Sequence, residues 1–171
     1  IGHSGERPLA ADEQALLPRD MIMNYWNYGQ REVAPHLAAI ATYRAMGYEP
    51  VVSPGLHNWN RFWPDFATAR ATIEPCLRAV HQAGVKMAML TMWGDDGQEC
   101  LFDLNYPALA CFLAWCREAD PPEAVWLRRC ERIAGMPAAA LLAIAKLEQA
   151  VPASTMPEGL AISAKMLFYD D

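Results

Sequence analysis

One tryptophan and three carboxylates stand together near the middle of the chain, at a spacing that could bind a sugar. They are Trp93, Asp95, Asp96 and Glu99, and they directly follow an almost wholly apolar run at residues 85–92. Aromatic rings cover the C–H face of a pyranose, and carboxylates accept hydrogen bonds from its hydroxyl groups. The segment is therefore typical of one wall of a polar, sugar-like pocket.

Two other interpretations of the carboxylates stay open. Asp95, Asp96 and Gly97 in isolation are typical of a turn closed by Asx hydrogen bonds. With Glu99 they could also bind a hard cation, although the EF-hand pattern is absent and no helical histidine pair has metal-ligand spacing. We expect no metal and no cofactor. A barrel enzyme with a metal on these carboxylates remains an alternative.

Two further clusters of polar and aromatic residues occur earlier, at residues 24–29 and 53–60. Their side chains suited to a sugar are Trp26, Tyr28, His57, Asn58 and Trp59. A lone tryptophan at the end of a strand is more often a packing residue than a ligand contact, and a lone histidine in a loop is as often structural. Three such clusters at one end of three neighbouring strands favour a binding site more strongly than any one alone.

The elements that must position these clusters alternate along the first half of the chain. Residue patterns predict strands at 21–26, 48–53 and 85–92, and helices at 10–17, 33–46 and 72–82. The last of these helices has Pro75 in its first turn and Gly84 as its stop. The 85–92 run has no polar alternation, which predicts a strand buried on both faces of a parallel sheet. Ligands of parallel α/β proteins bind at the carboxyl ends of the strands.

The second half of the chain is predicted to be helical. Helices are expected at residues 106–118, 122–134 and 137–150, two of them opened by prolines and the middle one ended by Gly135. Residues 160–169 are ambiguous between strand and helix.

Composition narrows the function classes. The chain has 171 residues and a net charge of −6, so it lacks the basic field that a nucleic-acid partner requires. No apolar run reaches the length of a membrane span, and no signal segment opens the chain. Its five cysteines form no CxxC pair, which favours free buried thiols in a reducing, cytoplasmic compartment. The start at Ile1, without Met, is typical of part of a larger protein.

The order of the three clusters resembles glycoside hydrolase family 20, the β-N-acetylhexosaminidases. The likeness rests on Tyr-Trp-Asn-Tyr at 25–28, Ser-Pro-Gly-Leu-His-Asn-Trp at 53–59 and Leu-Thr-Met-Trp-Gly-Asp-Asp-Gly-Gln-Glu at 90–99. The last resembles the bacterial branch whose final barrel strand ends in Trp-Gly-Asp-Asn/Asp-Gly-x-Glu. The resemblance covers residues 15–118. It implies an α/β fold in which 1–118 hold the last three strands of a (β/α)₈ TIM barrel and 119–171 form a helical C-terminal region.

The resemblance also implies roles for the aromatic residues. In the family, tryptophans at these strand ends enclose the N-acetylhexosamine. Trp26, Trp59 and Trp93 match those positions, and Trp63 matches less well.

For the polar residues the resemblance implies contacts with sugar hydroxyls or the acetamido group. Asp95 is the best match for the carboxylate that holds hydroxyls, with Asp96 and Glu99 as rivals. Tyr28, His57 and Asn58 match more loosely. The branch often has Asp where this chain has Asn27, so a charged contact is not expected there.

The family's general acid is missing from this chain. Its mechanism is substrate-assisted: the acetamido oxygen attacks the anomeric carbon, while an adjacent Asp-Glu pair on an earlier strand orients the acetamide and protonates the leaving oxygen. The pair Asp12–Glu13 opens a helix, where it complements the helix dipole instead. We expect the catalytic pair upstream of Ile1, so this chain alone should be inactive.

The expected function is therefore that of the C-terminal part of a hydrolase, a retaining exo-glycosidase acting on terminal N-acetylglucosamine or N-acetylgalactosamine. Three strands of a barrel leave open edges, so this part would need the missing barrel half or a partner chain. A non-catalytic carbohydrate-binding module is the alternative from a different class.

Overall fold

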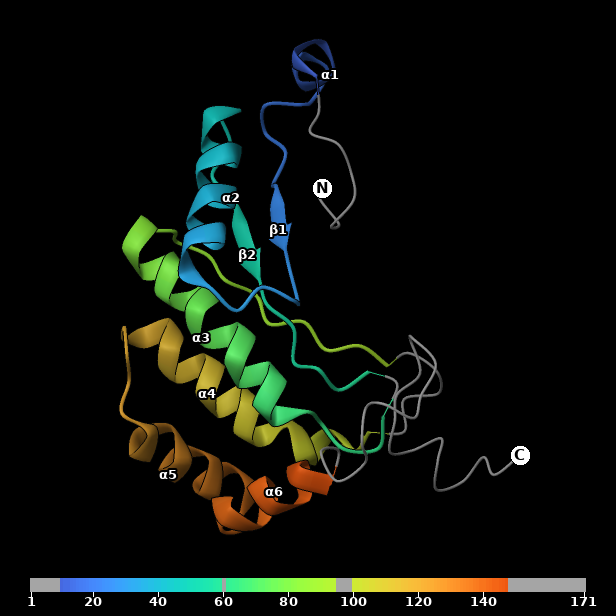
Figure 1. Ribbon diagram of the computed structural model, residues 1–171, viewed down its shortest axis with the longest axis vertical. Coiled ribbons are helices and arrows are strands. Elements are labelled where there is room, and N and C mark those ends of the chain that lie inside the picture. The colour runs from blue at the N-terminus through green and yellow to red at the C-terminus, as the bar shows by residue number, and fades with distance from the viewer. Residues whose placement is uncertain (1–9, 60, 95–99, 148–171) are drawn as a thin grey trace, which may run out of the picture.

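The computed structural model describes residues 10–59, 61–94 and 100–147 (Figure 1). Six helices, two strands and one short 3₁₀ helix occur among these residues in the order α1 (Ala11–Ala15), β1 (Asn24–Trp26), α2 (Val33–Ala45), β2 (Val51–Ser53), α3 (Phe66–Ala83), η2 (Phe102–Asn105), α4 (Tyr106–Arg117), α5 (Glu123–Ala134) and α6 (Ala138–Ala145). The expected mixture of strands and helices is confirmed, with helices in the majority.

The sheet is parallel, as predicted, but its regular strands are short. β1 pairs with β2, and Asn24 and Trp26 lie opposite Val51 and Ser53. Residues 85–92 run beside the other edge of β2, joined to it by isolated parallel bridges rather than by a continuous ladder. We call this stretch the edge segment. The sheet thus has the order β1, β2, edge segment, which is also the order in the sequence.

Helices cover one face of the sheet. Tyr25 pairs with Val52, and Val52 bridges to Ala88, so these three side chains point to the same side. On that side the ring of Tyr25 contacts His36 and Tyr43 of α2. Figure 1 shows α2 beside the strands, α3 packed against α2, and α4 packed against α3. The alternate residues of each strand face the other way.

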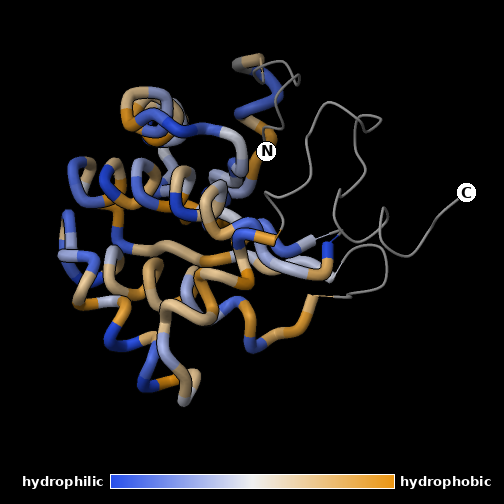
Figure 2. Tube along the Cα trace, turned by 60° about the horizontal axis from the view of Figure 1, so that its bottom comes forward, coloured by the Kyte–Doolittle hydropathy of each residue, from blue (hydrophilic) through white to orange (hydrophobic). Residues whose placement is uncertain are grey.

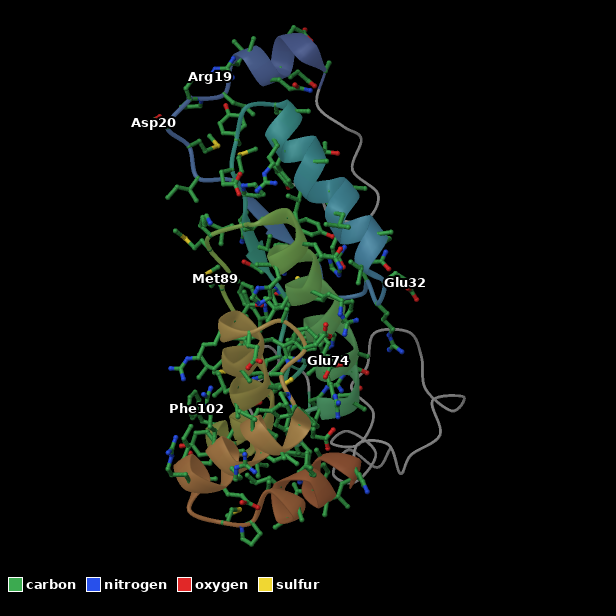
Figure 3. The ribbon with its side chains drawn as sticks, turned by 90° about the vertical axis from the view of Figure 1, so that its left-hand side faces the viewer. Arg19, Asp20, Glu32, Glu74, Met89 and Phe102 are labelled. Atoms are coloured by element: carbon green, nitrogen blue, oxygen red, sulfur yellow. The ribbon has the colours of Figure 1, made fainter. Side chains whose placement is uncertain are left out.

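The prediction that residues 85–92 are buried on both faces is wrong. Met87 is 56% exposed and Met89 is 47% exposed, and Figure 3 shows Met89 at the margin of the molecule. These side chains are exposed because the edge segment lies at the edge of the sheet. Ala88 points toward the helices and is half-buried, whereas Met87 and Met89 point to the opposite face and are exposed.

The helix predicted at 72–82 begins six residues earlier, at Phe66. Asp65 caps it, because Asp65 Oδ1 accepts the backbone N–H of Thr68 at 3.0 Å and Oδ2 accepts its hydroxyl at 2.7 Å. Pro75 therefore lies in the helix interior and not in the first turn. Gly84 ends the helix with a φ of +64°, as the pattern predicted.

The three C-terminal helices form where the sequence predicts them, as far as the described residues extend. α4 packs against both α3 and α5, and α6 packs beside α4 and α5. Figure 2 shows hydrophobic and hydrophilic residues interleaved along the helices. On α5 the inward residues are Trp126 and Cys130, four apart, and Arg70 of α3 lies over the Trp126 ring at 5.6 Å. Residues 160–169 lie outside the described part.

Two features bear on the predicted environment of the protein. All five cysteines are free thiols, four of them buried and Cys116 exposed on α4. None of the described helices is long and apolar enough to cross a membrane.

Candidate functional site

Five aromatic side chains gather where β1, β2 and the edge segment end. Their ring centroids are separated by 5.6 Å for Trp26 and Trp93, 5.3 Å for Trp26 and Tyr28, 4.8 Å for Tyr28 and Trp59, and 4.7 Å for Trp59 and His57. We call these five residues the aromatic wall. The expectation that the three clusters meet at one end of the sheet is therefore met for the aromatic residues.

A glycine makes room for the centre of the wall. Gly55 follows β2, and a Cβ atom at this position would lie 2.6 Å from Cδ1 and 2.7 Å from Cε1 of Tyr28. The tyrosine ring thus lies directly on the backbone of residue 55. Trp59 approaches the same point, with Cη2 3.0 Å from the position of that Cβ. Only glycine fits here without moving an aromatic ring.

Hydrogen bonds connect the aromatic wall to the backbone that follows β2. The indole N–H of Trp93 donates to the hydroxyl of Tyr28, and that hydroxyl lies 2.5 Å from Thr91 Oγ1. Thr91 Oγ1 in turn donates to the carbonyl oxygen of Pro54 at 3.2 Å. The wall is therefore bonded to the backbone that follows β2.

Asn58 holds the backbone of Trp93. Its Nδ2 donates to the Trp93 carbonyl at 3.2 Å, and its Oδ1 accepts the Trp93 N–H at 3.3 Å. Both ends of the amide are thus used within the protein. Asn58 was predicted as a sugar contact, and in this geometry it orients the tryptophan.

His57 is a buried part of the wall. Its backbone has a φ of +57°, a conformation that is strained for a residue other than glycine and that persists only where the surroundings enforce it. Burial, together with the nearby guanidinium of Arg61, lowers its pKa to about 4, against the opposing effect of Asp65. The ring is neutral at neutral pH, and its Nε2 lies 3.3 Å from Thr72 Oγ1 on α3.

Four further predicted residues are not members of the aromatic wall as defined by the described contacts. Asp95, Asp96 and Glu99 lie outside the described residues. Trp63 packs edge-on against Phe62, with ring centroids 5.9 Å apart.

Asn27 closes a local turn beside the wall. Its Oδ1 accepts the backbone N–H groups of Gly29 and Gln30 at 3.1 and 2.9 Å. This is an Asx turn, so the side chain serves the backbone.

Two residues of the site were not singled out from the sequence. Thr91 lies within the almost wholly apolar run at residues 85–92, and Gly55 directly follows the strand predicted at 48–53 and Pro54. Strand alternation could have found Thr91, because it places residue 91 on the same face as Trp93. Gly55 has no such signal, because its role depends on where the Tyr28 ring lies in space.

The geometry suits a ligand with an apolar face. Indole and phenol rings offer flat surfaces at the carboxyl ends of parallel strands, where α/β proteins bind small molecules. Within the described ranges, no group of three or more histidine, cysteine, aspartate or glutamate side chains could hold a metal ion.

Comparison with known proteins assigns no family to this chain. No known family's sequence profile matches it, and no curated protein matches it significantly.

Proposed function

We propose that this chain is the C-terminal part of a glycoside hydrolase of family 20, an exo-β-N-acetylhexosaminidase that removes terminal N-acetylhexosamine. The observation that carries the proposal is the aromatic wall. Trp26, Trp59 and Trp93 come from three different strand ends, and they are the residues that the family resemblance assigns to the sugar. Their convergence supports that assignment, because a chance likeness does not require them to meet.

The arrangement of the strands supports a partial (β/α)₈ barrel. In a complete barrel of this kind, parallel strands follow one another in sequence order and their helices lie outside. Here the strands are parallel and in sequence order, and α2 packs against the face that carries Tyr25. Met87 and Met89 are exposed on the other face, which in a barrel would be the interior. We propose residues 1–118 as barrel and 119–171 as a helical region, with the remaining strands supplied by further chain.

In the proposed enzyme, this chain binds the sugar and further chain supplies the general acid. The sugar's acetamido oxygen would attack the anomeric carbon while a carboxylic acid from further chain protonates the leaving oxygen. The wall holds the sugar, and Asp95, with Asp96 or Glu99, takes its hydroxyls. His57 is not the acid, because its pKa of about 4 leaves it neutral at neutral pH. The free thiols support a reducing, cytoplasmic compartment.

Hydrolysis of p-nitrophenyl β-N-acetylglucosaminide tests the proposal. We would compare the product of the complete reading frame with this 171-residue chain, each with Asp95→Ala as a variant. We expect activity in the longer protein, its loss in Asp95→Ala, and none in the short chain. Activity in the short chain alone would overturn the upstream placement of the acid. Activity lost to a chelator would favour the metal alternative.

A non-catalytic carbohydrate-binding module is the second candidate. Its support is that the wall is assembled within this chain by contacts among described residues. Binding of N-acetylglucosamine by a longer protein that hydrolyses no N-acetylhexosaminide would favour the module over the enzyme.

A further inference from the structure

Thr91 lies at the base of the aromatic wall, and its hydroxyl contacts two oxygen atoms. Thr91 Oγ1 is 2.5 Å from Tyr28 Oη and 3.2 Å from the carbonyl oxygen of Pro54. Tyr28 Oη also accepts the indole N–H of Trp93. These four groups form one chain of hydrogen bonds, from the backbone after β2 to the rim of the wall.

The two ends of this hydrogen-bond network have fixed roles. The indole of Trp93 can only donate, and the carbonyl of Pro54 can only accept. If Thr91 donates to the carbonyl, the proton between Thr91 and Tyr28 is the tyrosine's, and each contact holds one proton. If Thr91 donated to Tyr28 instead, its oxygen would face the carbonyl oxygen with no proton between them. The first arrangement is favoured because it leaves no two oxygen atoms in close contact without a hydrogen between them.

We propose that Thr91 is a positioning residue of the sugar site: it accepts a hydrogen bond from the Tyr28 hydroxyl and so holds the Trp93 indole in the wall. This inference rests on the proposed function for the identity of the ligand. Tyr28 then offers a bound sugar a lone pair and no proton. The sugar group that meets it is an N–H or an O–H, not the acetamido carbonyl.

The main variant is Thr91→Val, which keeps the β-branched shape and the strand preference but removes the hydroxyl. Thr91→Ser is the matched control, because it keeps the hydroxyl. Two readouts come from ¹⁵N-labelled protein: the position of the Trp93 indole N–H cross-peak, assigned with Trp93→Phe, and the dissociation constant for N-acetylglucosamine from titration of the indole cross-peaks.

We expect Thr91→Val to shift the Trp93 cross-peak and to weaken N-acetylglucosamine binding about fivefold, the effect of one net hydrogen bond. Thr91→Ser should keep the cross-peak in place and bind within about twofold of the parent chain. Tyr28→Phe should shift the cross-peak as Thr91→Val does. In the Trp93→Phe background, Thr91→Val should weaken binding less, because part of its effect passes through that indole.

Three results would overturn the inference: an unmoved cross-peak in Thr91→Val, an equal shift in Thr91→Ser, or undiminished weakening in the Trp93→Phe background. If neither this chain nor the longer protein binds N-acetylglucosamine, the proposed sugar ligand is wrong. The cross-peak positions then still decide whether Thr91 holds Trp93.

Discussion

Replacing Gly55 by alanine should displace the centre of the aromatic wall. The new Cβ would lie 2.6 Å from Tyr28 Cδ1, whereas carbon atoms in ordinary contact are about 3.5 Å apart or more. The ring must therefore move by about 1 Å. The 2.5 Å contact between Tyr28 Oη and Thr91 Oγ1 would lengthen beyond hydrogen-bond range. The hydrogen bond from the Trp93 indole N–H to the Tyr28 hydroxyl would be disturbed as well.

The expected magnitudes follow from this clash. Overpacking of this kind costs about 1–3 kcal/mol in the free energy of unfolding. Loss of the Tyr28 and Trp93 geometry should weaken N-acetylglucosamine binding by about tenfold, because two linked hydrogen bonds are disturbed. Urea unfolding measures the first quantity and titration of the indole cross-peaks the second.

The chain offers a matched control for this substitution. A Cβ at Gly29 meets nothing within 4 Å, so Gly29→Ala should change neither stability nor binding. In a Tyr28→Ala background most of the cost of Gly55→Ala should disappear, since the main clash is with that ring. Two results would refute the conclusion that the Tyr28 ring packs directly on the backbone of Gly55. One is that Gly55→Ala behaves like Gly29→Ala, and the other is that Tyr28→Ala does not reduce the loss of stability caused by Gly55→Ala.

Three further predictions concern the rest of the chain. Because the pKa of His57 falls from 6.5 to about 4 on folding, the unfolded chain binds the extra proton between these values. The free energy of unfolding should therefore drop as the pH falls from 6.5 to 4, by at most roughly 3 kcal/mol, and urea unfolding of His57→Gln should show a flatter pH dependence. Met87→Glu combined with Met89→Glu should change the free energy of unfolding of this chain by no more than about 0.5 kcal/mol, because both side chains are exposed. In the longer protein the same double variant should abolish hexosaminidase activity, because the two side chains would line a closed barrel. Retained activity there would count against the partial barrel. A thiol reagent should modify Cys116 first in the folded protein and reach all five cysteines only after unfolding, and rapid labelling of a second thiol would contradict the buried positions of the others.

The ends of the helices were predictable because single residues decide them. Gly47, Gly84 and Gly135 all have positive φ values and lie one or two residues after α2, α3 and α5, where a residue with a side chain would be strained. The start of α3 was missed because Pro75 suggested a first turn. The cap of Asp65 on Thr68 begins the helix, and the proline is accommodated within it.

The exposure of the edge segment could not be predicted from its own residues. An apolar run without alternation indicates burial on both faces only when a sheet continues on its far side and both faces are covered. In the described structure the segment pairs with β2 alone, so Met87 and Met89 stay in solvent while Ala88 packs inward. The same sequence would be fully buried in a closed barrel.

The polar groups of the aromatic wall are mostly committed to one another. The Asn58 amide holds the backbone of Trp93, and the Tyr28 hydroxyl lies between Trp93 and Thr91. What the wall offers a ligand is therefore mainly ring surface, which binds the apolar face of many sugars without distinguishing among them. Discrimination between sugars needs hydrogen bonds to individual hydroxyl groups, because a site built for such a bond loses most when the partner is missing. In the proposed site, affinity thus comes from the aromatic wall, and selectivity from the carboxylates at positions 95, 96 and 99.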